Sequence, residues 1–174
     1  MDTTNETQRL AMLADAASRN HEDGDPIAAL IAQVHAETVD LLGGSTALGR
    51  KIATDSDALT AITRGFPAEV LDALQAAGVP QSAIEMVIAP TANPMDDPVA
   101  GRRLTCRESD AAWRLAGAVA LASQVLAGRS TANAWLSRPK PTLGGMTGYE
   151  ALQTSVGTGC LKGVLYRLDS GSTA

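Results

Sequence analysis

The segment from Thr105 to Gly128 constrains the fold more than any other part of the sequence. Thr105 and Glu108 have the Thr-x-x-Glu spacing of a capping box, which predicts a helix beginning at Cys106. Gly128 is the expected stop, so the helix covers about 106–127 and is the longest predicted. Apolar residues recur at helical spacing along it and are expected to face inward: Ala111, Leu115, Ala118, Val119, Ala122, Val125 and Leu126.

The rest of the chain also favours helices over strands. Its 174 residues include 31 alanines and only five aromatic residues. Alanine has the highest helix propensity, whereas strands are enriched in branched and aromatic side chains. We therefore predict an all-α fold, although a small β-element around 91–104 stays open.

Proline, glycine and capping residues predict where the other helices begin and end. A marginal helix is expected over 8–18, and a stronger one starts at Asp25-Pro26 and stops at Gly43. Further helices are predicted over 45–54, 57–63, 67–77 and 81–88. In the last third, one short helix ends at Trp135-Leu136, another starts on the capping box of Thr147 and Glu150, and the last stops at Gly171.

Charge and helix pattern predict three regions: a flexible tail over 1–24, a helical region over 25–104, and a second helical region over 105–174. Net charge is −6 over residues 1–60, −3 over 61–110 and +4 over 111–174, which sums to the stated −5. An acidic front and a basic back suggest two surfaces with different partners. The first nine residues contain acids and no apolar core, which argues against a signal peptide, and no uncharged run is long enough for a membrane helix.

The sequence offers little chemistry for an enzyme. The two histidines, His21 and His35, lie in the acidic N-terminal part with no metal-ligand or nucleophile pattern around them. Gly157-x-Gly159 lacks the preceding strand of a dinucleotide loop and is interpreted as a bend between helices. Cys106 and Cys160 stand far apart and are interpreted as spare thiols, which fits a reducing cytoplasm. We expect no catalytic site, no metal and no cofactor.

One pattern points to DNA. The helices over 67–77 and 81–88, joined at Gly78-Val79, look like the first parts of a helix-turn-helix region. The reading helix should follow, but residues 91–98 contain two prolines and two aspartates, which oppose a helix facing phosphates. Arg102, Arg103 and Arg107 either contact backbone phosphates or form a solvated helix end, and the sequence leaves both alternatives open.

Another pattern points to a protein partner. Residues 111–174 contain four of the five aromatic residues, and Trp135, Tyr149 and Tyr166 stand near cations. The nearby cations are Arg138, Lys140 and Arg167. Aromatic residues and arginines are typical interface anchors. The alternative is that Trp135 packs beneath the long helix and that the cations are solvated.

A series of short motifs over about 62–171 resembles the Xre/MbcA/ParS-type antitoxins, the partners of toxins with a RES domain. Each motif alone is weak, but their order and spacing are fairly specific. The motifs are Gly65-Phe66-Pro67; Ile88-Ala89-Pro90-Thr91; Arg103-Leu104-Thr105 with Glu108-Ser109-Asp110 and Arg114-Leu115; Ala134-Trp135-Leu136; Leu143-Gly144-Gly145; Thr147 with Glu150; and Leu165-Tyr166-Arg167-Leu168 before Gly171.

The resemblance implies an antitoxin that needs no cofactor. The helix-turn-helix-like part would form a homodimer and in many members binds operator DNA, which would regulate the operon. The C-terminal part over 129–171 would cover the active-site mouth of an NAD⁺-consuming toxin. Trp135, Leu136, Leu143, Gly144 and Gly145 would shape this docking part, with Arg138 and Lys140 beside them. Tyr149, Lys162, Tyr166 and Arg167 would contact the toxin directly.

Two departures from the family pattern bear on this expectation. Gly148 stands where members usually have proline after Thr147, and we expect it to loosen that helix start by up to about 1 kcal/mol. The segment 92–100 lacks the arginines of members that read DNA, so autoregulation is doubtful while toxin binding is unaffected. The alternatives are a stand-alone helix-turn-helix regulator and a helical adaptor with an unrelated partner.

Overall fold

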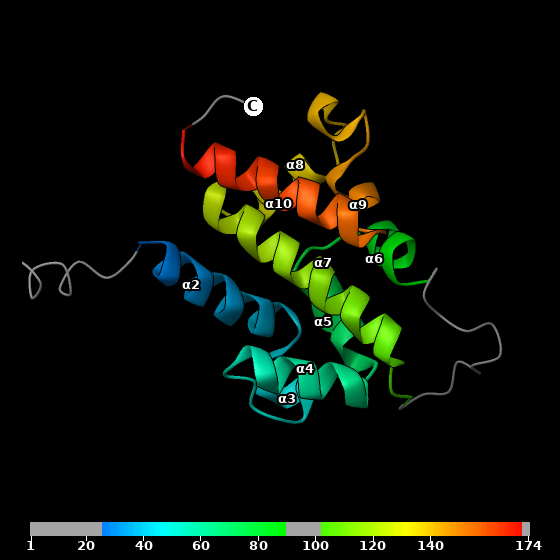
Figure 1. Cartoon of the computed structure of the whole chain (residues 1–174). Helices are drawn as coiled ribbons and strands as arrows, with labels where there is room; N and C mark the ends of the chain where they lie inside the picture. The colour runs from blue at the N-terminus through cyan, green and yellow to red at the C-terminus, as the bar shows by residue number, and fades with distance from the viewer. Residues whose placement is uncertain (1–25, 90–101, 172–174) are drawn as a thin grey trace, which may run out of the picture. The chain divides into compact units, whose positions relative to one another are not determined.

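The computed structural model describes residues 26–89 and 102–171, and within these ranges it contains helices and no strand (Figure 1). The predicted all-α fold is confirmed. The α-helices are α2 (Pro26–Leu41), α3 (Gly44–Leu48), α4 (Asp55–Arg64), α5 (Glu69–Ala76), α6 (Gln81–Ile88), α7 (Cys106–Val125), α8 (Arg129–Leu136), α9 (Gly148–Ala151) and α10 (Ser155–Asp169), and η2 (Pro141–Leu143) is a 3₁₀ helix. The chain divides into two compact units, residues 1–33 and 34–174. The predicted helix over 8–18 and the reading-helix slot at 91–98 lie outside the described residues.

Helix α7 is the central element of the second unit. It packs against α4, α5 and α6, and also against α8 and α10. Its predicted capping box is present, and the predicted inward residues from Ala111 to Ala122 are buried. Val125 and Leu126 are only half-buried, because the helix ends there and the chain turns at Ala127 (φ 54°) and Gly128 (φ 143°). The predicted boundary between 104 and 105 falls at the start of α7.

Two local predictions were wrong. The helix expected over 45–54 covers only Gly44–Leu48, because Gly49 adopts a left-handed conformation (φ 66°) and Thr54 caps the next helix instead. The carboxylate of Asp57 accepts hydrogen bonds from the backbone N–H groups of Ala53 and Thr54, both at 3.1 Å, which fixes the start of α4. The Gly157-x-Gly159 pair lies inside α10 and not between helices, since Thr154 caps α10 by accepting from the N–H of Gly157.

Both helices of the predicted helix-turn-helix-like pair are present. Helix α6 has the predicted bounds, and α5 begins two residues after Pro67. Gly78 turns the chain between them with φ 90°, a value that glycine adopts without a Cβ penalty. The β-element considered for 91–104 is represented, within residues 102–104, by one isolated antiparallel bridge between Pro67 and Arg103.

Candidate protein-binding surface

Lys140 closes the loop between α8 and α9. Its Nζ donates hydrogen bonds to the carbonyl oxygens of Trp135 at 2.5 Å and Arg138 at 2.8 Å, and it lies 4.0 Å from the centre of the Trp135 ring. Burial lowers the pKa of this ammonium group, and the nearby Arg138 lowers it further. Lys140 is therefore a structural cation that holds the loop, while Arg138 is exposed and Trp135 is half-buried.

The double glycine shapes the next turn. Gly144 and Gly145 are exposed and have positive φ values of 67° and 85°, which favour glycine. Leu143 and Leu136 are buried on the inner side of this segment. The turn leaves the side chain of Met146 on the surface, 45% exposed. The two positive φ values and the two buried leucines together define the path of this loop.

Gly148 has a packing role that the sequence did not reveal. A Cβ at this position would lie 2.6 Å from Cδ2 of Leu136 and 3.2 Å from its backbone Cα and O. Leu136 is fully buried, so it has little room to move. The expectation that Gly148 loosens the start of α9 is incomplete, since its missing side chain lets α9 approach α8 closely.

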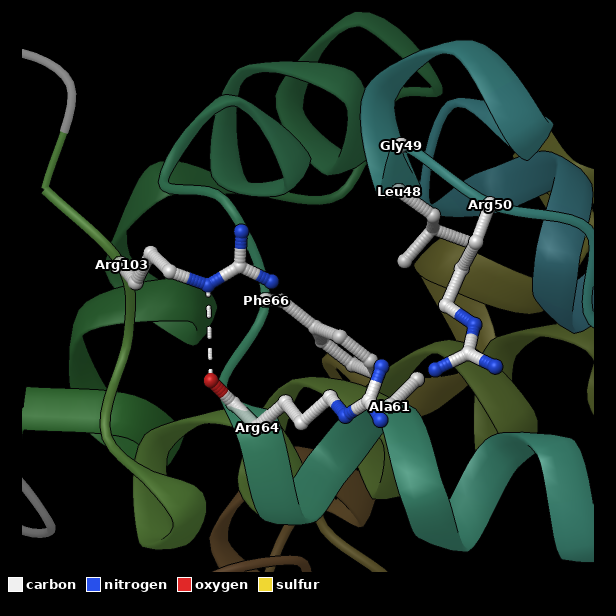
Figure 2. Close-up of a pocket in the computed structure, with 7 residues that line it drawn as sticks. All are labelled: Leu48, Gly49, Arg50, Ala61, Arg64, Phe66 and Arg103. Carbon is white, nitrogen blue, oxygen red and sulfur yellow. Dashed lines mark hydrogen bonds between the residues drawn. The ribbon is translucent and has the colours of Figure 1, made fainter.

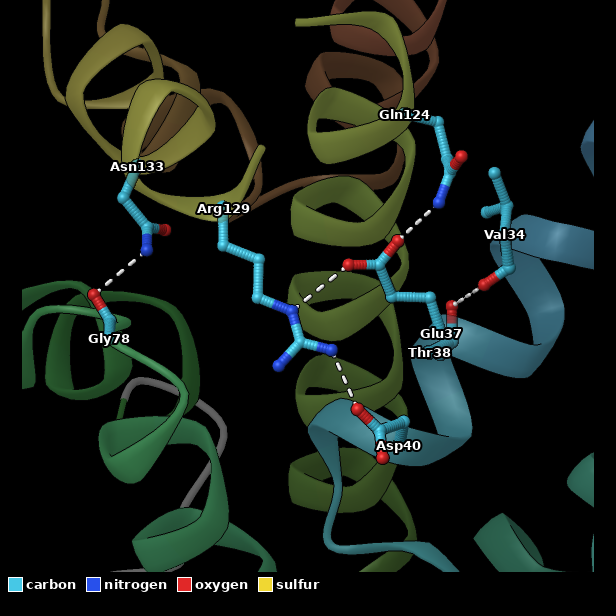
Figure 3. Close-up of polar contacts among 8 residues, drawn as sticks. All are labelled: Val34, Glu37, Thr38, Asp40, Gly78, Gln124, Arg129 and Asn133. Carbon is cyan, nitrogen blue, oxygen red and sulfur yellow. Dashed lines mark hydrogen bonds and ion pairs between the residues drawn. The ribbon is translucent and has the colours of Figure 1, made fainter. Parts of the chain in front are cut away.

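Tyr149 lies beneath the surface. Its side chain is 4% exposed, burial raises its pKa, and its hydroxyl donates to Oδ1 of Asn133 at 2.7 Å. Nδ2 of Asn133 donates in turn to the carbonyl oxygen of Gly78 at 2.9 Å, which joins α8 to the turn between α5 and α6 (Figure 3). In this structure Tyr149 is therefore buried, and it holds the side chain of Asn133 in place. Sequence reasoning missed Asn133, because no motif marks it.

Helix α10 has two unlike sides. Leu161, Val164 and Leu165 are buried on its inner side. Its outer side carries Val156, which is 76% exposed, and Tyr166, which is 46% exposed. We define the α10 outer face as the exposed residues Val156, Gly159, Lys162, Tyr166 and Arg167. Of the four residues predicted to contact a partner directly, the structure brings Lys162, Tyr166 and Arg167 together on this face.

Comparison with known proteins identifies the family of the chain. No protein-family model matches the chain. The curated protein Antitoxin Xre of Pseudomonas putida is 31% identical over 121 residues, which cover 70% of this chain and 76% of that protein. The chain belongs to the Xre antitoxin family.

Two of the three arginines considered for DNA contact, Arg102 and Arg103, form hydrogen bonds within the antitoxin itself. The guanidinium of Arg102 pairs with both carboxylate oxygens of Glu108, Nη1 to Oε2 at 3.1 Å and Nη2 to Oε1 at 2.8 Å. Arg103 donates from Nε and Nη2 to the carbonyl oxygen of Gly65 at 3.1 and 2.6 Å. Both side chains therefore have hydrogen-bond partners in the chain, although Arg103 is exposed, and Arg107 is exposed with no hydrogen bond or ion pair among the described residues.

Glu108 links Arg102 to the first residues of α7. The carboxylate, 2% exposed, also accepts from the backbone N–H of Thr105 at 2.7 Å. Burial by itself raises the pKa of Glu108, but hydrogen bonds from Arg102 and Thr105 outweigh it and lower the pKa below its usual value. We call Gly65, Arg102, Arg103, Thr105 and Glu108 the Arg102 corner.

A second polar network holds the start of α8. Arg129 donates from Nε to Glu37 at 3.1 Å and from Nη2 to Asp40 at 2.6 Å (Figure 3). Gln124 of α7 donates to the other oxygen of Glu37 at 2.6 Å. Hydrogen bonds, first that with Asp40, raise the pKa of Arg129. The three-residue spacing of Glu37 and Asp40 on one helical face was the only signal in the sequence.

The described residues contain no group of three or more His, Cys, Asp or Glu placed to hold a metal ion. Cys106 and Cys160 are exposed free thiols. Within the same residues, no single helix has the length and apolarity of a membrane span. Helices α7 and α8 reach the length and apolarity of a membrane span only when they are taken together, and the chain bends by 116° between them.

Proposed function

We propose that this antitoxin neutralises a toxin with a RES domain by docking the α10 outer face and the 138–146 loop over the mouth of the toxin's active site. Family membership supports an antitoxin role and hence a toxin partner. The RES-type partner follows from the resemblance of the motif series. The mechanism is steric, so the antitoxin contributes shape and contact area and no reacting group.

The observation that carries this proposal is the exposure of Val156 and Tyr166 on a helix whose other side is fixed in the core. Three of the six exposed large apolar residues in the described chain, Met146, Val156 and Tyr166, belong to the segment 129–171. Exposed apolar groups beside cations are typical of interface centres. One buried aromatic anchor contributes about 2 kcal/mol or more to a complex.

Rigid presentation adds to the suitability of this face. Arg114 of α7 donates to the carbonyl oxygen of Leu152 at 3.0 Å, directly before α10. Thr158, buried in the first turns, donates to the carbonyl oxygen of Thr154 at 2.8 Å. Anchored backbone reduces the ordering cost of binding, because fewer groups lose freedom in the complex.

The test removes the two central contacts together. We expect Tyr166→Ala with Arg167→Ala to release toxicity when antitoxin and toxin are co-expressed, while the circular dichroism and melting temperature stay unchanged. The matched control is Leu59→Ala with Arg107→Ala, which removes an exposed apolar residue and an exposed arginine outside the segment 129–171. Unchanged neutralisation by the Tyr166/Arg167 variant, at normal expression, would contradict the proposal.

A second variant adds bulk instead of removing contacts. A Cβ at Gly159 meets no atom within 4 Å, so the free chain has room for a side chain there. We expect Gly159→Trp to fold normally and to lose neutralisation. The bulky indole would keep the toxin from reaching the side chains of Val156 and Tyr166. A folded Gly159→Trp antitoxin that neutralises as well as the unchanged chain would place the docking surface elsewhere.

Operator binding and homodimerisation through the 25–104 region remain separate proposals. The α5–Gly78–α6 arrangement supports a helix-turn-helix-like region. The internal pairing of Arg102 and Arg103 leaves Arg107 as the remaining candidate for phosphate contact. A gel shift with the DNA upstream of the gene, at two salt concentrations, tests whether the chain acts as a regulator. Sedimentation of the purified chain tests the dimer.

A further inference from the structure

A pocket of about 370 Å³ lies beside α4, and none of its lining residues belongs to α10 (Figure 2). It is lined by Leu48, Gly49, Arg50, Ala61, Arg64, Phe66 and Arg103. Three of these seven residues are arginines, and none is an acid. The volume lies in the lower range of pockets that hold small molecules.

The three arginines keep unused hydrogen-bond donors at the pocket. Nη1 of Arg50 is buried and has no hydrogen-bond partner among the described residues. Arg64 is exposed at the end of α4, and Figure 2 shows its guanidinium pointing toward that of Arg50. Arg103 uses Nε and Nη2 on backbone oxygens, which holds its guanidinium at the opposite side of the pocket. A buried N–H without an acceptor is costly, so such donors mark a place for an acceptor.

Asp57, the carboxylate whose pKa Arg50 helps to lower, is not part of the pocket. Its oxygen accepts from the backbone of Ala53 and Thr54 and from the Thr54 hydroxyl at 2.9 Å. These bonds, first that from Ala53, lower the pKa of Asp57 and occupy its Oδ2 as the cap of α4.

We propose that this arginine pocket binds a phosphate-bearing small molecule. The planar fork of a guanidinium matches phosphate oxygens, and a group carrying up to two negative charges balances several cations where a single carboxylate cannot. The walls formed by Leu48, Ala61 and Phe66 give an apolar side to the pocket. This side suits the organic part of a small phosphate compound.

Phosphate groups have two sources, small molecules and the nucleic-acid backbone. The buried donor of Arg50 favours the small molecule, because a terminal phosphate can enter a pocket whereas a duplex backbone meets exposed cations first. The site is independent of toxin neutralisation, since its residues lie outside the segment 129–171. A failure of one proposal therefore leaves the other intact.

The test is calorimetry on the purified full chain with inorganic pyrophosphate and, separately, AMP. We expect a Kd below about 1 mM for at least one of them, weakening as salt is raised. Arg50→Gln and Arg64→Gln should each weaken binding by about tenfold or more, since each removes a charged donor. Arg107→Gln is the matched control, because it removes the same charge from an exposed site outside the pocket and should leave the Kd unchanged.

Arg64→Gln keeps the test decisive should Arg50→Gln fail to fold, since Arg64 is exposed and its side chain makes no hydrogen bond or ion pair with a described residue. A DNA duplex forms the third arm. Duplex binding that depends on Arg50 and Arg64, without binding of pyrophosphate or AMP, would overturn the small-molecule proposal and assign the pocket to the nucleic-acid backbone. No binding of either small probe, or equal weakening by Arg107→Gln, would also overturn it.

Discussion

The Arg102 corner and the α10 outer face both bring arginine close to apolar residues, but they treat the cation differently. In the corner, Glu108 accepts from two nitrogens of Arg102, and the carbonyl oxygen of Gly65 accepts from two nitrogens of Arg103. On the α10 outer face, Lys162 and Arg167 are exposed beside Tyr166, and no described side chain accepts from them. A cation is available to a partner only where its own chain supplies no acceptor, and sequence position alone does not distinguish the two cases.

The largest expected effect comes from the Arg102 corner, where the arginines are bonded within the chain. Glu108→Ala should lower the free energy of unfolding by about 3 kcal/mol, because it removes both carboxylate hydrogen bonds of Arg102 and one of the two bonds of the α7 capping box. Urea denaturation measures the change. The control is Asp110→Ala on the same helix, whose exposed pair with Arg114 should contribute less than about 1 kcal/mol. Equal losses in the two variants would show that burial of Glu108 adds nothing.

The carboxylate of Glu108 should also affect how the free energy of unfolding depends on pH under acidic conditions. The pKa of Glu108 is lower in the folded chain than the ordinary 4.5. Its contribution is therefore complete above about pH 4.5 and is lost as the pH falls through the folded-state pKa. We expect the unfolding free energy of the unchanged chain to fall more steeply below that pH than that of Glu108→Gln. Parallel acid limbs would contradict this assignment.

Helix α10 allows the comparison to be made within one element. A Cβ at Gly157 would overlap the backbone carbonyl oxygen of Ala151, and that backbone cannot rotate away as a side chain could. Gly157→Ala should cost about 1–3 kcal/mol in unfolding free energy, the range of overpacked sites. Thermal and urea denaturation measure it. A neutral result would mean that the turn between α9 and α10 adapts, and would weaken the claim that α10 is rigidly held.

Tyr149→Phe separates support of the surface from contact with a partner. It removes the hydrogen bond to Asn133 but keeps the ring, so we expect a loss of about 1 kcal/mol in stability. Neutralisation in co-expression should be unchanged, because Tyr149 is buried. Loss of neutralisation without loss of stability would instead return Tyr149 to the contact surface.

Helix ends that are marked by residues close by in the sequence, such as capping boxes and glycines, could be predicted. The bounds of α6, the capping boxes of α7 and α9, and the glycine stops depend on neighbouring residues, and all are present. The prediction failed where a local signal had two uses. Thr54 was read as the end of one helix and is the cap of the next, and Gly157 was read as a break although the cap of α10 accepts its N–H.

Side-chain partners distant in sequence were beyond prediction. Whether Arg102 meets a phosphate or Glu108 depends on how residues 102–104 bridge to Phe66 and Pro67, which no periodicity encodes. The same holds for the pocket arginines, which come from three separate segments. Of the expected contact residues, Tyr149 could not be recognised as buried, since its aromatic character fits a core and an interface equally well.

The smallest expected effect comes from Gly159, two residues from Gly157 on the same helix. Its position is open, so Gly159→Ala adds a methyl group without a clash and lowers the entropy of the unfolded chain. We expect a gain of about 0.5–1 kcal/mol in unfolding free energy, opposite in sign to the effect at Gly157. Neutralisation should persist, because one methyl group covers little of the face. If both substitutions destabilised the chain alike, α10 would be packed on two sides, and its outer face would not be free for a toxin.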